Sequence, residues 1–110
     1  SPPYMPRHHK WNPLYGGDPK KAGYDTYLKR MQFIFSKIMP LMKQNARLVV
    51  QVDNLLHGKN FTPLVHDIAN VLTRDFIQID EVLVKWDDKK RDKPKPDYPF
   101  TQYLVFKKKA

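Results

Sequence analysis

The chain begins Ser1-Pro2-Pro3-Tyr4, and the remainder of the sequence is best understood from this tetrapeptide outward. Two consecutive prolines fix the backbone φ angle and remove two hydrogen-bond donors, so the segment is stiff before it meets a ligand. The Ser1 hydroxyl and the Pro2 carbonyl can accept hydrogen bonds, and Tyr4 carries a flat ring. The segment is either a preorganised binding loop or a disordered proline-rich amino terminus, and the elements that follow decide between the two.

Residues 5–24 are predicted to form a loop. Prolines and glycines recur there without hydrophobic periodicity, and a loop of this length in a compact domain is often functional. Basic side chains alternate with aromatic rings, which suits a nucleic-acid strand because phosphates attract cations and bases stack on rings. The alternative is a surface loop whose rings pack locally. The residues predicted to bind nucleic acid are Arg7, Lys10, Trp11, Lys20 and Lys21.

A helix is predicted over residues 25–44. Apolar side chains recur there at steps of three and four, which is the spacing of one helix face. Asp25 is the predicted N-cap. Pro40 conflicts with this pattern, because proline should kink the helix or end it near Met39.

The short, nearly continuous apolar run at 47–53 predicts a strand that is buried on both faces, as in a parallel sheet. Ligands of open α/β sheets bind beyond the carboxyl ends of their strands. The side chains that follow this strand therefore form a possible ligand-binding edge, and they are Asp53, Asn54 and His57.

Further elements follow in the same alternation. Thr62 and Pro63 predict the start of a second helix, as an N-cap followed by proline at the first helical position. The last strand has no long crossover before it, so it is predicted to pair antiparallel with its predecessor. The predicted elements are a loop at 55–60, a helix from 62 to 74, strands at 76–86 and 101–107, and a charged loop at 87–100.

Composition limits the class of protein. The 110 residues suffice for one domain with a modest core, and the net charge of +9 favours a polyanionic partner, nucleic acid before an anionic membrane surface. The sequence has no cysteine, no signal peptide and no apolar run near the roughly 20 residues of a membrane span, so a cytoplasmic protein is expected. No ligand set accompanies His8 and His9, so no metal site is predicted. The first residue is serine, which suggests a piece of something longer.

The tetrapeptide resembles the catalytic motif of the S-adenosylmethionine-dependent DNA methyltransferases that modify exocyclic amino groups, on cytosine N4 or adenine N6. The motif of that family has Asp, Asn or Ser, then Pro-Pro, then an aromatic residue. Residues 41–50, 63–68, 82–85 and 102–108 are similar to the later segments of the same family, so the resemblance covers nearly the whole chain. It implies an α/β fold, namely the second half of a doubly wound, Rossmann-like methyltransferase sheet whose last strand is antiparallel.

The resemblance also implies a role for each residue of the tetrapeptide. Ser1 and the Pro2 carbonyl would accept hydrogen bonds from the target amine, so that its lone pair faces the methyl donor. Pro3 would stiffen the loop, and Tyr4 would stack on a base flipped out of the duplex. Serine in first place favours cytosine N4 over adenine N6.

The sequence departs from the family in one respect. The Gly-rich turn and the acidic residue with which the family holds S-adenosylmethionine are missing, so these cofactor-binding residues are unknown here and the isolated chain is expected to be inactive. A second chain, or self-association, would have to complete the sheet. Two other functions remain open: a non-catalytic nucleic-acid-binding or interaction module, and a methyltransferase acting on RNA or on a protein glutamine.

Overall fold

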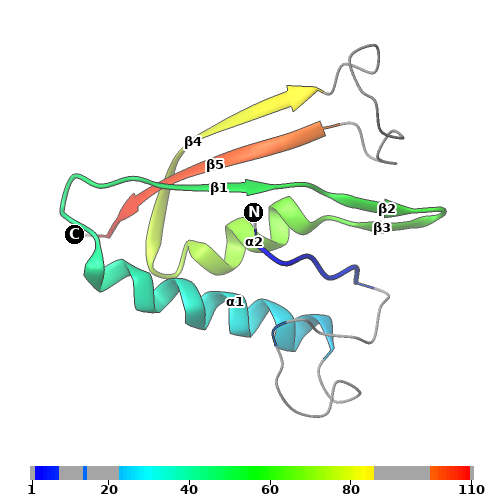
Figure 1. The fold of residues 1–110 in the computed structure, drawn as a ribbon, viewed down its shortest axis with the longest axis horizontal. Helices are drawn as coiled ribbons and strands as arrows, with labels where there is room; N and C mark the ends of the chain where they lie inside the picture. Colours follow the sequence, from blue (N-terminus) through cyan, green and yellow to red (C-terminus); the bar gives the residue numbers. More distant parts are fainter. Residues whose placement is uncertain (1, 8–13, 15–22, 86–99, 110) are drawn as a thin grey trace.

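The computed structural model describes residues 2–7, 14, 23–85 and 100–109. Figure 1 shows helices α1 and α2 on the same side of a sheet, with a hairpin extending beyond the end of β1. Within the described residues, the elements in chain order are α1 (Tyr24–Ile38), the 3₁₀ turn η2 (Met39–Leu41), β1 (Leu48–Val52), β2 (Leu55–His57), β3 (Asn60–Thr62), α2 (Leu64–Leu72), β4 (Phe76–Lys85) and β5 (Phe100–Lys108).

The larger sheet has the strand order β1-β5-β4, and β5 is antiparallel to both of its neighbours. Strands β1 and β4 are therefore parallel to each other, with the last strand of the chain inserted between them. The prediction that the last strand pairs antiparallel with its predecessor is confirmed. A bulge between Gln78 and Asp80 shifts the register of β4, which bends the strand and changes its twist.

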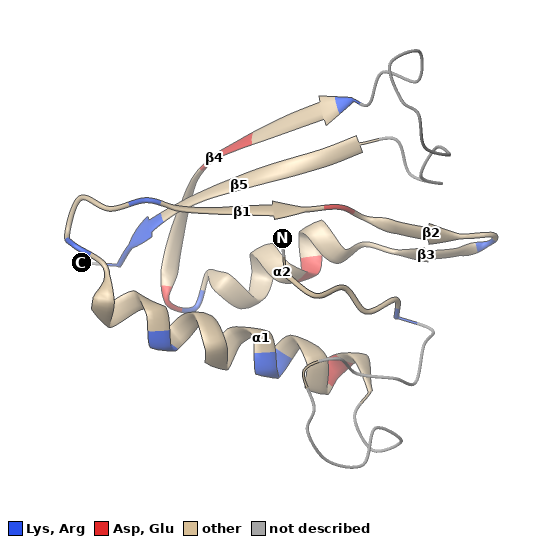
Figure 2. Cartoon of the chain, in the orientation of Figure 1, with Lys and Arg blue, Asp and Glu red and all other residues tan. Residues whose placement is uncertain are grey.

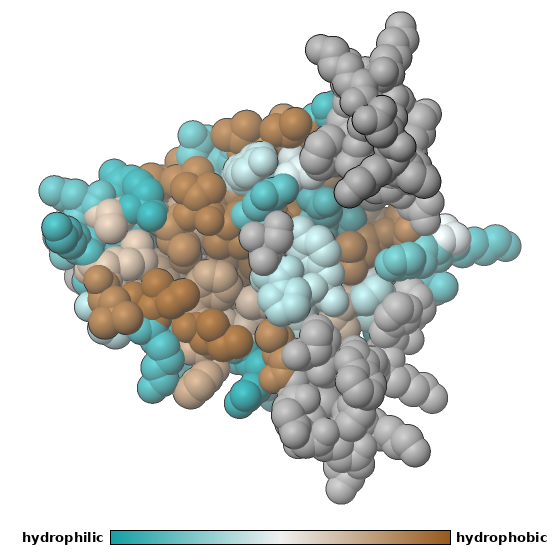
Figure 3. Space-filling view, viewed as in Figure 1, coloured by the Kyte–Doolittle hydropathy of each residue, from teal (hydrophilic) through white to brown (hydrophobic). Residues whose placement is uncertain are grey.

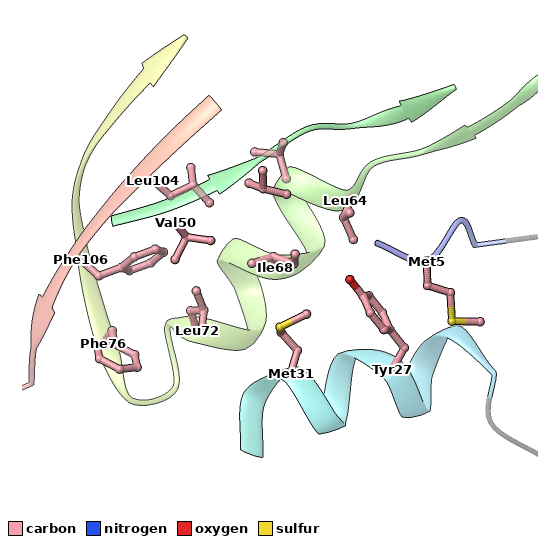
Figure 4. Packing of buried hydrophobic residues seen from close by; sticks show 12 residues of the cluster. Met5, Tyr27, Met31, Val50, Leu64, Ile68, Leu72, Phe76, Leu104 and Phe106 are labelled. Atoms are coloured by element: carbon pink, nitrogen blue, oxygen red, sulfur yellow. The ribbon is translucent and has the colours of Figure 1, made fainter. Parts of the chain in front are cut away.

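The hydrophobic core lies between the sheet and the helices (Figure 4). Leu104 and Phe106 of β5 point toward Ile68 and Leu72 of α2, and Met31 of α1 lies on the far side of that helix. The rings of Phe76 and Phe106 meet edge to face, with their centroids 6.2 Å apart, which is a favourable arrangement for aromatic pairs. The fully or nearly fully buried apolar residues are Met5, Tyr27, Met31, Val50, Val52, Leu64, Val65, Ile68, Leu72, Phe76, Leu104 and Phe106.

Strand β1 is buried on one face, and the prediction of burial on both faces is wrong for this chain. Val50 and Val52 face the helices and are 4% and 0% exposed, whereas Val49 points the other way and is 56% exposed. The reason is that both described helices lie on one side of the sheet (Figure 1), so alternate residues of each strand have no covering layer.

Helix α1 begins one residue before the predicted N-cap. Gly23 is the N-cap and contributes no side-chain hydrogen bond, while Asp25 lies in the first turn, where a carboxylate complements the helix dipole. The α-helix ends at Ile38 and not at 44, because Pro40 lacks the N–H that a further helical turn requires. The expectation that Pro40 ends the helix near Met39 is confirmed, and a short 3₁₀ turn follows.

Residues 55–62 form a hairpin, and the prediction of a loop at 55–60 is wrong. Its register pairs Leu55 with Thr62 and His57 with Asn60, which leaves Gly58 and Lys59 as a two-residue turn. Gly58 has a φ of +60°, which suits the first position of a tight hairpin turn and favours glycine. Thr62 therefore ends a strand, and Pro63 is the N-cap of α2 in its place.

The remaining boundaries agree with the sequence to within one or two residues. Strand β4 ends at Lys85 and β5 begins at Phe100, close to the predicted strands at 76–86 and 101–107. Most of the predicted loops at 5–24 and 87–100 lies outside the described residues, although Tyr24 belongs to α1.

Candidate active site

The described part of the tetrapeptide, Pro2 to Tyr4, is held against the core. The hydroxyl of Tyr27 donates a hydrogen bond of 2.6 Å to the Pro3 carbonyl. Met5, the residue that follows the tetrapeptide, is 1% exposed and belongs to the core. Figure 4 shows Met5 beside the Tyr27 ring, with Leu64 of α2 nearby. This packing contradicts the disordered alternative for residues 2–7, while Ser1 lies outside the described residues.

Tyr27 is suited to this anchoring role because it stays protonated. Burial raises the pKa of its hydroxyl, and its proximity to Tyr4 raises that pKa further. A neutral phenol remains a hydrogen-bond donor at physiological pH, as its bond to the Pro3 carbonyl requires. The neighbouring Tyr24 stacks on Tyr27, with ring centroids 5.9 Å apart, and donates a hydrogen bond of 2.7 Å to the Asp67 carboxylate. This pair of tyrosines fixes the start of α1 against both the tetrapeptide and α2.

Arg7 links the tetrapeptide segment to the hairpin. Its backbone N–H donates to the Thr62 hydroxyl at 2.8 Å, and its guanidinium donates to the Phe61 carbonyl at 3.1 Å. Thr62 is 1% exposed, whereas Arg7 is exposed, so the first of these hydrogen bonds is partly buried. Strand β3 therefore lies beside the segment that follows the tetrapeptide, as Figure 1 also shows.

Of the three predicted edge residues, Asn54 has a structural role. Its Oδ1 accepts a hydrogen bond of 2.9 Å from the Val65 N–H, one of the free donors in the first turn of α2. Asp53 directly follows β1, and its Oδ1 is buried without a hydrogen-bond partner among the described residues. A buried carboxylate oxygen without a partner is unfavourable, so Asp53 is the edge residue that best fits a ligand or a further polypeptide segment.

His57 lies apart from the other two edge residues. It is exposed and faces Asn60 across the hairpin, next to the turn. His57 is three positions after Asn54 in an extended chain, so the two residues are roughly 10 Å apart. The structure therefore does not gather Asp53, Asn54 and His57 into one site.

Most of the residues predicted to bind nucleic acid lie outside the described ranges. Arg7 is described, but Lys10, Trp11, Lys20 and Lys21 lie outside the described residues. In Figure 2, basic residues within the described part mark the segment after the tetrapeptide and the tip of the hairpin, which carries Lys59.

Three contributors to this region were not predicted as site residues: Tyr27, Thr62 and the hairpin turn. Tyr27 is indistinguishable in sequence from other members of the apolar stripe of α1, because its partner is 24 residues away. The turn has a usable signal, since Gly58-Lys59 stands between residues that can pair across a hairpin.

The described residues offer neither a metal site nor a membrane-spanning helix. No group of three or more histidine or acidic side chains there could hold a metal ion. Within the same ranges, no helix combines the length and the apolar character needed to cross a membrane.

Comparisons with known proteins find likeness in structure alone. No protein-family model and no curated protein matches the sequence. A candidate DNA modification methylase from Thermus thermophilus is similar in two crystal structures. Its selenomethionine form has a TM-score of 0.65 and 17% identity over 79% of this chain and 38% of that chain. Its complex with S-adenosyl-L-methionine has a TM-score of 0.66 and 15% identity over 89% and 43%.

The likeness defines the class of fold. The chain has a partial Rossmann-like methyltransferase fold with an antiparallel last strand, as the sequence predicts. It spans about two-fifths of the length of the Thermus thermophilus protein that it matches.

Proposed function

We propose that this chain is the catalytic-motif half of an S-adenosylmethionine-dependent methyltransferase that modifies an exocyclic amino group in DNA, with cytosine N4 favoured over adenine N6. The observation that carries the proposal is the anchored tetrapeptide in a methyltransferase fold. Pro3 and Met5 are fixed to the core, so Pro2 and Tyr4 are held in a defined position before any substrate arrives. Preorganisation of this kind is what a hydrogen-bonding catalytic loop requires.

The two proline carbonyls have different roles in this proposal. The Pro3 carbonyl accepts the Tyr27 hydroxyl, which leaves the Pro2 carbonyl and the Ser1 hydroxyl as acceptors for the two N–H groups of the target amine. The lone pair of that amine is delocalised into the base, and two accepted hydrogen bonds favour the geometry in which it projects outward. Tyr4 supplies the face on which the flipped base stacks.

The cofactor does not fit the described residues alone. The described glycines are Gly23, which caps α1, and Gly58, which forms the hairpin turn, and neither lies between a strand and a helix. A glycine-rich turn in that setting is what cradles a nucleotide-like cofactor. We therefore assign to the chain the orientation of the amine, and we assign cofactor binding to a complementary half.

A methylation assay with two arms tests this function. The isolated chain is expected to neither bind S-adenosylmethionine at micromolar concentration nor methylate DNA, because the cofactor-binding residues are absent. Joined to a cofactor-binding half, it is expected to transfer labelled methyl groups to DNA, and nucleoside analysis should identify N4-methylcytosine. Tight cofactor binding by the isolated chain would contradict the division into halves. Methyl transfer to RNA or to glutamine alone would contradict the choice of substrate.

The DNA partner is supported by the charge of +9, by Arg7 beside the tetrapeptide and by Lys59 on the hairpin. Arg7 follows the tetrapeptide, and Lys59 is exposed at the tip of the hairpin that Arg7 holds. We propose that this hairpin contacts the DNA backbone beside the target base.

Lys59→Ala is expected to weaken binding to short duplexes and to flatten its salt dependence. Each phosphate contact adds about 0.9 to the slope of log K against log salt, so the slope should fall by about that amount. Fluorescence anisotropy at several salt concentrations measures it. Lys43→Ala is the matched control, since Lys43 is also exposed but lies beyond η2, at the opposite end of the molecule (Figure 1). Equal slopes for the two variants would remove the hairpin from the DNA interface.

A further inference from the structure

Strand β4 has an unusual distribution of exposed residues. It begins at Phe76, which is 1% exposed, but all seven residues from Ile79 to Lys85 are exposed. Four of these are aliphatic: Ile79 and Val82 are 42% and 48% exposed, and Leu83 and Val84 are 57% and 38% exposed. Figure 3 shows apolar surface over this outer strand. Side chains of a strand alternate between faces, so β4 presents apolar groups on both faces of the sheet.

This strand is also an edge. In the order β1-β5-β4, the described residues supply β4 with a single neighbour, β5. Edge strands leave a row of backbone groups available to another strand, and proteins usually protect them with charges, prolines or bulges. The bulge near Ile79 and the charges of Asp80, Glu81 and Lys85 flank the segment, but Val82-Leu83-Val84 carries no such protection. The other edge strand, β1, exposes only one aliphatic residue, Val49.

The backbone of β4 restricts how a further strand can pair with it. The Glu81 N–H donates to Oδ1 of the preceding residue, Asp80, at 2.8 Å, so this N–H points away from β5. Because successive residues of a strand direct their N–H and C=O groups to opposite sides, Glu81, Leu83 and Lys85 present their backbone groups at the open edge. In an antiparallel ladder, such residues must lie opposite one another.

Two symmetric registers of β4 with a second β4 satisfy this condition near the apolar centre. With Leu83 opposite Leu83, Glu81 faces Lys85 of the second copy twice, and Val82 faces Val84 twice. With Val82 opposite Val82, Asp80 faces Val84 and Lys85 faces Ile79, so no charge meets its opposite. Opposite charges directly across a ladder stabilise it, and so do paired β-branched side chains. The sequence of β4 is thus complementary to itself in the first register.

We propose that two copies of this chain associate through their β4 edges, antiparallel, with Leu83 on the two-fold axis. The two three-stranded sheets then form one continuous sheet, and the Asp80 bond to the Glu81 N–H is exchanged for a ladder bond to the carbonyl of Lys85 in the second copy. Val82 and Val84 extend the apolar face that carries Val49. A contact of one short strand pair is small, so the dimer is weak, with a dissociation constant in the micromolar range.

Analytical ultracentrifugation of the chain at concentrations from about 1 µM to about 1 mM tests the association. The wild-type chain is expected to change from monomer to dimer across this range. Leu83→Lys should weaken dimerisation at least about tenfold, because it places two like charges opposite each other on the axis. Val49→Lys, at an equally exposed aliphatic position on the other edge strand, should leave dimerisation unchanged. A monomer at every concentration, or equal loss in both variants, would overturn the proposal.

Charge reversal tests the register. Glu81→Lys and Lys85→Glu should each weaken the dimer, since each places like charges opposite one another in both symmetry-related pairs. The double variant restores opposite charges and should recover the wild-type dissociation constant to within about a factor of three. Circular dichroism of each variant at low concentration checks that the monomer is folded. Single reversals that weaken the dimer without recovery in the double variant would overturn this register.

Discussion

Replacing Ser1 by alanine is expected to slow methyl transfer by about 10² to 10³-fold, once the chain is joined to a cofactor-binding half. The substitution removes one of the two acceptors for the target amine and leaves the Pro2 carbonyl in place. The lost hydrogen bond matters most as the amine gives up its conjugation with the base, so the loss falls on the chemical step. About 2 to 4 kcal/mol of barrier corresponds to this change, which is typical for one preorganised hydrogen-bonding group.

Single-turnover methylation with saturating DNA and cofactor measures this step without product release. Ser36→Ala is the matched control, because Ser36 is the only other serine in the sequence and its hydroxyl bonds to the Phe33 carbonyl within α1. A Ser1→Ala rate equal to that of the Ser36→Ala control would exclude the tetrapeptide as the catalytic motif. The non-catalytic binding module would then be the better hypothesis.

Replacing Tyr27 by alanine is expected to reduce the free energy of unfolding by about 3 to 5 kcal/mol, as for other large buried aromatic residues. Tyr27 is 0% exposed and packs between the tetrapeptide segment and the core (Figure 4). Single domains have only about 5 to 15 kcal/mol of stability, so this variant should unfold at much lower urea concentration than the wild type. Circular dichroism during urea titration measures the change.

Tyr27→Phe separates packing from the hydrogen bond to Pro3. The ring remains, but the Pro3 carbonyl loses its donor, and the loss of one typical hydrogen bond costs about 0.5 to 1.5 kcal/mol. Tyr24→Phe is the comparison, since it removes a hydroxyl that bonds to the Asp67 carboxylate and leaves the hydrogen bond from Tyr27 to Pro3 in place. Should Tyr27→Phe be as stable as the wild type, the tetrapeptide would not depend on Tyr27 for its position.

Local patterns predict most of the elements because helices and strands leave a period in the sequence. The spacing of apolar residues indicates α1 and α2. Pro40 indicates the end of α1, because proline lacks the backbone N–H of a helical hydrogen bond in any tertiary structure. The hairpin is missed because its two strands have three residues each, which is too short to show a period. Its turn residue, Gly58, is the better signal.

The candidate site is predicted only in part. The tetrapeptide and Arg7 stay predictions, and they stand out in the sequence because their residue types carry the chemistry themselves. Asn54 is placed correctly at the end of β1, but its amide caps α2, which the sequence does not indicate. The burial of β1 on one face depends on which side of the sheet the helices occupy, and the apolar run at 47–53 is compatible with either outcome.

The sequence by itself determined most of the elements and their order, apart from the hairpin, together with the stiffness of the tetrapeptide, the positive charge and the antiparallel last strand. Each of these properties depends on residues that are close together in the chain or, for the charge, on the total number of charged residues. Only the tertiary structure decided what holds the tetrapeptide, because Pro3 meets Tyr27 and Arg7 meets Thr62 across 24 and 55 residues. Contacts between residues so far apart in the chain depend on how the helices pack against the sheet. This packing depends on the shapes of the buried surfaces, which local sequence patterns do not specify.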